Sequence, residues 1–292
     1  MNRRMIAAGV AMTLAAALPA LAQGNGNGNG NGHGHGPSRP PSSNSLAPPA
    51  IATSNAGVTP FAWLDDATVL EPGAVSAAIS VMRWSGSTAS EVDMPVVDVA
   101  FGLTDRVHLT ASVPRVVDGV DSGGPVGGVG TSFFGIKIAL VDDRRRGVKV
   151  SGGMTLEVLG EGVLQALDAG ASRVQAGVPV SAELDRGPLR LFAGGGYFTR
   201  GIWFGGGGFG VRTGRRTAVS ASFSRSWRRA DTLDVPLSDR DRNEVSGGVS
   251  YALSPQVSVF ASIGHTIATL DENGAGATVG AGIACFLPPV RR

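Results

Sequence analysis

Beyond residue 73 the sequence alternates, in one segment after another, between apolar residues and small or polar residues. The stretch 217–227 (T-A-V-S-A-S-F-S-R-S-W) is an example, in which Val219 and Phe223 lie at odd positions and Ser220 and Ser224 at even ones. Because successive side chains of a strand point to opposite faces, such a strand has one apolar face and one narrow polar face. About eleven residues are also enough to cross a bilayer as a tilted strand.

Segments of this kind recur at 74–84, 94–103, 106–117, 131–141, 147–158, 172–184, 188–199, 201–213, 216–228, 243–253, 256–268 and 276–286. Tight turns join them at 104–105, 142–146, 185–187, 214–215 and 254–255. The other connections are long, at 85–93, 118–130, 159–171, 229–242 and 269–275, with one short exception at Arg200. Outer-membrane barrels sort their connections in this way, and Greek-key sandwiches do not. The sequence therefore predicts an all-β fold, an up-and-down antiparallel transmembrane β-barrel of about 12 strands over 74–286.

In such a barrel the apolar face meets lipid and the polar face lines the lumen, whereas in a soluble protein the apolar face would form the core. The polar faces are rich in Gly, Ser and Thr, which suit the crowded interior of a narrow barrel. The polar face of the expected strands also carries charged and histidine side chains, which are therefore expected in the lumen: Asp98, His108, Lys137, Lys149, Glu157, Arg173, Glu183, Arg190, Arg212, Arg228 and Glu244. They could pair with one another in a water-filled interior, or form a constriction that selects solutes.

The N-terminal region predicts export. A basic start, an apolar run and an A-x-A site make residues 1–22 a signal peptide, cut after Ala22. Residues 23–57, a Gly/Asn/His repeat and then a Pro/Ser-rich run, are expected to be a disordered linker. Residues 58–73 form a lead-in that could also plug the lumen, and 287–292 form a short C-terminal tail.

Charge and composition exclude several partners. Loss of Arg3 and Arg4 with the signal peptide lowers the 25 Lys and Arg to 23, equal to the 23 Asp and Glu, so no basic excess points to nucleic acid. His33 and His35 lie on a flexible tether without a third ligand, so we expect neither a metal nor another cofactor. The expected partners are outer-membrane lipids, a small-molecule solute and the barrel assembly machinery.

Three features at the strand ends give further expectations. An interfacial aromatic belt is expected from Trp84, Tyr197, Trp203, Trp227 and Phe286. Arg225 lies on the lipid face by phase, so it either snorkels to the headgroups or follows a bulge near Ser224. A barrel hydrolase would need a Ser/His site, for which His265 is the histidine nearest the outer end.

Several short motifs resemble a family of Gram-negative outer-membrane barrels named after the meta-pathway of phenol degradation. They are Asp65-Asp66-Ala67, Glu71-Pro72-Gly73, Phe101-Gly102-Leu103-Thr104-Asp105-Arg106-Val107, Val113-Pro114, Gly128-Val129-Gly130 and Gly135-Ile136-Lys137. The resemblance covers roughly residues 60–286 and implies a channel or transporter for small, hydrophobic or aromatic, organic compounds.

The function expected from the sequence is an outer-membrane channel or transporter in a Gram-negative bacterium, not an enzyme. The alternatives are a structural or adhesive barrel with a closed lumen, and a barrel lipid hydrolase or deacylase.

Overall fold

A computed structural model gives the structure of the protein and describes residues 66–86, 90–121, 124–160, 172–199, 201–228, 241–269 and 276–289. The side chains of 120–126, 228, 241–242 and 268–269 are outside this description. The expected signal peptide and linker lie outside the described residues. Within the described ranges, no helix is long and apolar enough to cross a membrane.

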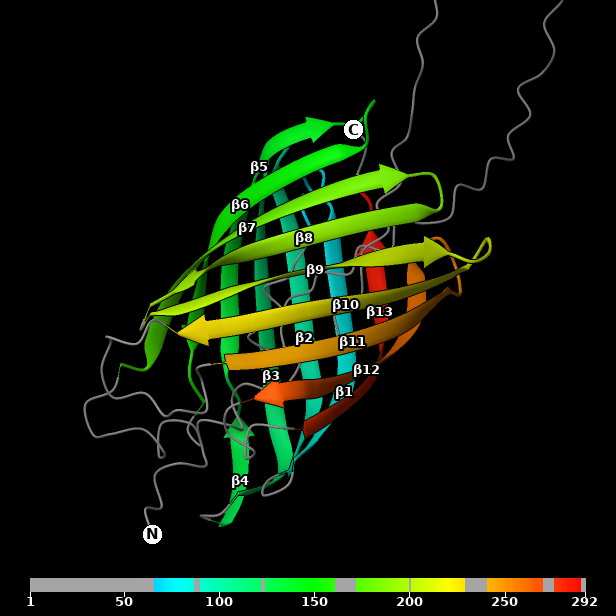
Figure 1. Cartoon of the computed structure of the whole chain (residues 1–292). Coiled ribbons are helices and arrows are strands. Elements are labelled where there is room, and N and C mark those ends of the chain that lie inside the picture. The colour runs from blue at the N-terminus through cyan, green and yellow to red at the C-terminus, as the bar shows by residue number, and fades with distance from the viewer. Residues whose placement is uncertain are drawn as a thin grey trace, which may run out of the picture.

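Antiparallel strands make up most of the described chain (Figure 1). They are β1 (Val75–Gly86), β2 (Ser90–Thr104), β3 (Val107–Asp121), β4 (Gly124–Val129), β5 (Ser132–Asp143), β6 (Val148–Val158), β7 (Val174–Arg186), β8 (Leu189–Phe198), β9 (Ile202–Arg212), β10 (Thr217–Arg228), β11 (Asp241–Ala252), β12 (Val257–Thr269) and β13 (Gly276–Leu287).

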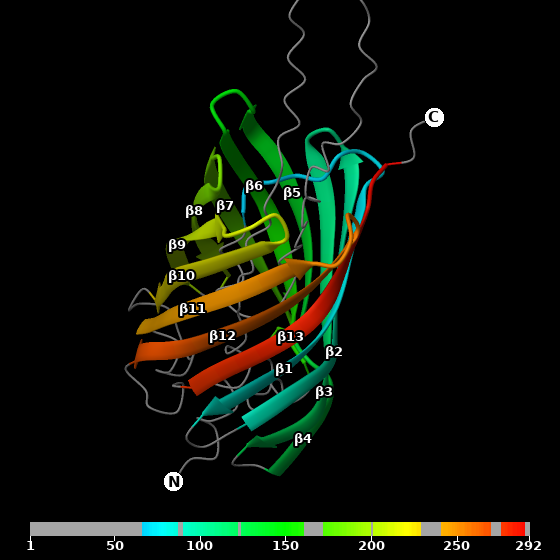
Figure 2. The ribbon, with the colours of Figure 1, turned by 90° about the vertical axis from the view of Figure 1, so that its right-hand side faces the viewer.

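Twelve of these strands close into a barrel, which confirms the fold expected from the sequence. Strands β5 to β13 each pair with the next in the chain, and β1 joins β13 in register from Val75↔Leu287 to Gly86↔Gly276. The circle closes through β1–β2, β2–β3 and β3–β5 (Figure 2). Strand β4 stands apart from the circle, because among the described strands its one partner is β3, which it pairs from Arg115 to Asp121.

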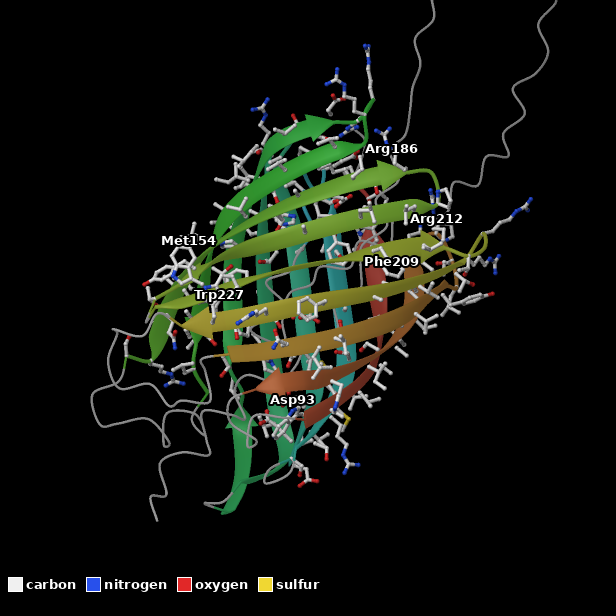
Figure 3. All side chains as sticks on the ribbon, in the orientation of Figure 1. Asp93, Met154, Arg186, Phe209, Arg212 and Trp227 are labelled. Carbon is white, nitrogen blue, oxygen red and sulfur yellow. The ribbon has the colours of Figure 1, made fainter. Side chains whose placement is uncertain are left out.

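The two ends of the barrel differ. Tight turns lie at one end, called here the turn end, between β2 and β3, β5 and β6, β7 and β8, β9 and β10, and β11 and β12. Strand β1 begins and β13 ends at the same end. The opposite end is called the loop end. Arg186 and Arg212 lie at the turn end, and Met154 and Trp227 toward the loop end (Figure 3).

The distribution of side chains is the reverse of that in a soluble protein, with apolar residues outside and polar residues inside. Large apolar residues lie exposed on the outer face, such as Ile79 and Ile263, which are both 61% exposed. Serines on the other face are buried in the barrel interior, such as Ser112 at 0% and Ser151 at 1%. A band of exposed apolar side chains around a closed barrel is the surface that hydrocarbon stabilises and water does not.

The connection expected at 85–93 is much shorter in the structure, because β1 extends to Gly86 and β2 begins at Ser90. Glu91 and Asp93 belong to β2 and are buried on its interior face, although the sequence placed them in the connection 85–93. The strand accommodates the proline through register shifts against β3 between Val92 and Val96. A proline cannot donate to the ladder, so irregular pairing is expected at this position.

The aromatic belt expected from the sequence is partly wrong. Tyr197, Trp203 and Trp227 lie exposed on the outer face of adjacent strands, and the rings of Tyr197 and Trp203 are 5.0 Å apart. Trp84 faces inward and is 1% exposed, because it shares the face of Met82 and Ser80 on β1. Phe286 also faces inward, where it packs against Leu70.

Arg225 lies on the outer face without any bulge in β10. Both ladders of this strand run in continuous register past Ser224, Arg225 and Ser226. Ser224 and Ser226 are buried and Arg225 is exposed, as simple alternation requires. Of the two alternatives, the bulge is therefore wrong, and the side chain lies close to the loop end of β10, where a long cation can reach the headgroups.

Candidate functional site

Of the lead-in expected at 58–73, the structure describes the part from Asp66 on, and from here the name lead-in means Asp66–Ala74. This segment lies across the turn end inside the barrel. Figure 2 shows it in blue, crossing that end before β1 begins. Its backbone is held against β2, since the Gly73 N–H donates to the Gly102 carbonyl at 2.8 Å and the Gly102 N–H to the Ala74 carbonyl at 2.9 Å. Leu70 and Ala74 pack with Ala100 and Phe286. The lead-in is therefore attached to the interior by both backbone and apolar contacts.

The close approach depends on a residue without a side chain. A Cβ atom built on Gly102 would lie 1.9 Å from the carbonyl oxygen of Glu71 and 2.7 Å from its carbon. Gly102 faces the interior of β2, so only glycine leaves room for the lead-in backbone at this level.

At the start of the lead-in, the Asp66 carboxylate is bound by two basic side chains of the wall. Asp66 Oδ2 lies 2.7 Å from Arg190 Nη2, and Asp66 Oδ1 lies 3.8 Å from Lys137 Nζ. Lys137 Nζ also donates to the Asp66 carbonyl at 2.9 Å. The Thr68 N–H donates to Asp66 Oδ1 at 2.8 Å, which fixes the carboxylate relative to its own backbone.

The wall contributes further charges around this contact. Glu183 accepts from Arg190 at 2.6 Å and from Lys149 at 2.9 Å, and Lys149 also reaches Asp185 at 3.1 Å. The Thr68 hydroxyl accepts from Lys149 at 3.2 Å and donates to Glu183 at 3.1 Å. The ion-pair network of the wall therefore continues into the lead-in.

Strand register explains why these residues meet. Lys149 on β6 is directly opposite Glu183 on β7, and Asp185 is opposite Arg190 on β8. Lys137 on β5 is opposite His108 on β3. All but Lys137 lie within a few residues of a tight turn, and Lys137 lies at the level of its register partner His108. Different strands therefore bring these inward side chains to the same end of the barrel.

His108 contacts the lead-in as a neutral acceptor. The Leu70 N–H donates to His108 Nδ1 at 3.3 Å, which places the ring proton on Nε2. His108 is 5% exposed, and its Nε2 has no acceptor among the described residues.

A charge count shows what Asp66 does for the site. The cations of this part of the wall are Lys137, Lys149 and Arg190, and the anions are Glu183 and Asp185. The wall by itself therefore carries one excess positive charge, which Asp66 neutralises. Burial raises the pKa of the Asp66 carboxyl, but the charges of Arg190 and Lys137 and the hydrogen bonds from Arg190 and Thr68 together lower it more, so the pKa lies below its ordinary value.

The sequence named eleven lumen candidates, and five of them meet the lead-in: His108, Lys137, Lys149, Glu183 and Arg190. Three others are buried elsewhere in the interior: Asp98 beside Ser112, Glu157 beside Gln175, and Glu244, which accepts from Thr266 at 3.5 Å. Arg212 donates to the Gly187 carbonyl at the turn end. Arg173 is exposed just before β7, and the side chain of Arg228 lies outside the described residues.

Sequence reasoning missed the residues that complete the site. Asp66 and Thr68 precede the first strand, so strand phase could not place them. The motif Asp65-Asp66-Ala67 marked this segment in the sequence without assigning its side chains to the site. Glu91 and Asp93 were missed because their segment was expected to be a loop.

No catalytic or metal arrangement emerges from the described parts of the chain. His265 is exposed on the outer face, and its register partners are Val245 and Ala277, neither of which is a nucleophile. No group of three or more His, Cys, Asp and Glu side chains among the described residues is placed to hold a metal ion. His33 and His35 lie outside those residues.

Comparison with known proteins shows the fold. No protein-family model and no curated protein matches the chain. Among solved structures, an outer membrane channel from Pseudomonas putida F1 is similar with a TM-score of 0.57 and 12% identity, over 76% of this chain and 98% of that one. The NanC porin is similar with a TM-score of 0.54 and 10% identity, over 72% of this chain and 98% of that one. The chain shares the fold of these outer-membrane barrels.

Proposed function

We propose that the protein is an outer-membrane channel for small organic compounds, and that the lead-in restricts its turn end. The observation that carries this proposal is the sorting of side chains, with apolar residues facing outward and Ser, Thr, Gly and charged residues facing the interior. An apolar interior would oppose the passage of polar solutes, and a polar outer face would oppose insertion in lipid. The fold shared with a channel and a porin supports the same function.

The proposed location is the outer membrane of a Gram-negative bacterium, with its lipids and barrel assembly machinery as partners. By the rule for such barrels, the tight turns, and with them the lead-in, face the periplasm. The sequence resemblance further suggests hydrophobic or aromatic solutes. No observation favours the hydrolase alternative, because His265 faces outward.

Conductance across a planar lipid bilayer tests the channel. The full-length protein is expected to give discrete steps, with larger steps for Asp66→Asn, which loses the charge bound by Arg190 and Lys137. The control is Glu71→Gln, which removes an exposed carboxylate from the same segment. A protein that shifts in gel mobility on boiling and floats with vesicles, yet never conducts, would be a structural barrel and not a channel.

Solute preference needs a separate comparison. Phenol serves as an aromatic probe and glycerol as a non-aromatic one, each added to the bilayer chamber at the same concentration. The proposal expects phenol to alter the open-channel current more strongly than glycerol. Equal effects of both would contradict a preference for aromatic compounds while leaving the channel in place.

A further inference from the structure

The contact between Asp66 and the wall has the form of a bound ligand. Its carboxylate belongs to a segment outside the barrel strands, and it is held by Arg190 at 2.7 Å and Lys137 at 3.8 Å. Guanidinium and ammonium groups are the side chains that recognise carboxylates in binding sites. The barrel wall thus forms the binding site, and Asp66 of the lead-in occupies it.

The binding site keeps donors that Asp66 does not use. Arg190 is 1% exposed, yet in the described structure its Nε and Nη1 have no hydrogen-bond acceptor. The Nε2–H of His108, the register partner of Lys137, is also buried without an acceptor in the described structure. Buried donors of this kind are usually satisfied, so the two on Arg190 and the one beside Lys137 indicate a site that can take more anion oxygens than Asp66 offers.

The charge of the wall points the same way. Without Asp66 this part of the wall carries one excess positive charge, and a monocarboxylate restores neutrality as well as Asp66 does. The ring of Phe192 lies 6.0 Å from Arg190 Cζ and helps to keep the guanidinium in place on β8.

We propose that Arg190, Lys137 and His108 form a carboxylate-binding subsite of the barrel interior, which Asp66 occupies until a small organic carboxylate displaces it. Displacement removes the Asp66–Arg190 and Asp66–Lys137 contacts and frees the start of the lead-in. The subsite thus couples the presence of an anionic solute to opening of the turn end. The coupling to opening depends on the proposed channel function, whereas binding of the carboxylate does not.

Calorimetric titration of the full-length protein in detergent micelles tests the binding. Butyrate is the probe, and butyramide is its neutral counterpart. A tethered competitor acts at an effective concentration in the millimolar range, so its removal strengthens binding of the free ligand. Asp66→Ala is expected to bind butyrate at least about tenfold more tightly than the unsubstituted protein. Glu71→Ala, a matched loss of one carboxylate from the lead-in, is expected to leave the affinity unchanged.

Two outcomes would overturn the subsite: Asp66→Ala binds butyrate no more tightly than the unsubstituted protein, or butyramide binds as well as butyrate. Adding Arg190→Gln to Asp66→Ala is expected to abolish binding. If gel mobility shows that this double variant does not fold, Lys137→Gln in the same background takes its place and is expected to weaken binding. Unchanged binding in the folded variant would also refute the subsite.

Release of the lead-in has its own measurement. In a Cys285→Ser background, Val69→Cys is labelled with a maleimide, and butyrate is expected to increase the labelling rate while butyramide is not. A labelling rate that butyrate leaves unchanged would refute displacement. A barrel that binds butyrate but never conducts would refute the channel and retain the subsite, so the two proposals fail separately.

Discussion

Gly102 sets the distance between the barrel wall and the lead-in. Its amide and carbonyl both bond the lead-in backbone, and its missing side chain leaves the space that the Glu71 carbonyl occupies. The contact is with backbone atoms, which cannot move aside as a flexible side chain can. A single methyl group at this position is therefore incompatible with the observed position of the lead-in.

Gly102→Ala is expected to displace the lead-in and leave the barrel intact, because the strand ladder of β2 tolerates alanine. The expected result is a larger single-channel conductance and faster maleimide labelling of Val69→Cys. Gly247→Ala is the control, since its Cβ would meet only ordinary contacts, the nearest at 3.5 Å. If Gly102→Ala conducts and labels like the control, the lead-in does not restrict the turn end.

Asp66 also predicts how the channel responds to pH. Its pKa lies below the ordinary carboxyl value, so its attraction to the wall is fully present above about pH 4 and is lost as pH falls through the depressed pKa. The groups facing it are Arg190 of β8, Lys137 of β5, Glu183 of β7 and the neutral His108 of β3. Conductance is therefore expected to be low at neutral pH and to rise below about pH 4.

The comparison with Asp66→Asn isolates this one carboxyl, because Glu183 and His108 remain in both proteins. The variant is expected to conduct strongly already at neutral pH and to lack the rise. Bilayer recordings between about pH 3 and 7 decide the matter. Identical pH profiles for the two proteins would assign the response to another group.

At the scale of the element, alternation predicted the strands well because each strand has one face toward the outside of the barrel and the other toward its interior. Segments such as 174–186 and 257–269 alternate at most of their positions, so the phase of each strand and its neighbouring turns can be read from the sequence. The method failed where a strand carries its charges inward beside a proline, as at Glu91 and Asp93. It also failed for Trp84, because aromatic residues suit both an interface and a crowded interior.

The functional site was predictable only in part for a related reason. Alternation along a strand places His108 and Arg190 on the interior face. Which side chains of different strands lie at the same height in the barrel depends on how the strands are staggered, and alternation does not give that. The partner from the lead-in lies outside any periodic pattern. Half of the site thus follows from strand alternation, and half from a tertiary contact that has no local signal.

Strand β4 is expected to be dispensable for the barrel. In the described part of the chain β4 has β3 as its one partner, and the circle closes through β3–β5 pairing at Val107–Ser112. Replacing residues 117–127 by an Asn-Gly turn, which suits a two-residue hairpin, would join the paired residues Val116 and Gly128 directly. The replacement also removes the end of β3 from residue 117 on, which pairs with β2 at Ser90–Val92. Heat-dependent gel mobility is expected to be unchanged, and loss of the mobility shift would show that the removed hairpin, β4 together with this end of β3, helps to close the barrel.

For the whole molecule, the decisive property is that stability depends on what surrounds the barrel. The interior is held by paired charges and hydroxyl groups, while the apolar outer face gains nothing from contact with water. Near an end of a strand a basic residue on the outer face can still reach the headgroups. Arg225 is such a case, since it is exposed three residues before the loop end of β10.

Arginine substitutions at two depths test this dependence on the surroundings. Ile263 is the middle residue of β12 and is 61% exposed, whereas Leu253, 51% exposed, lies just beyond β11 at the turn end. Ile263→Arg is expected to lower the free energy of unfolding from lipid vesicles by about 2–4 kcal/mol, and Leu253→Arg by no more than about 1 kcal/mol. Guanidinium unfolding in vesicles, followed by tryptophan fluorescence, measures both. Because the two variants add the same charge, equal losses would mean that depth in a bilayer does not determine the cost, and the outer face would then not be a membrane surface.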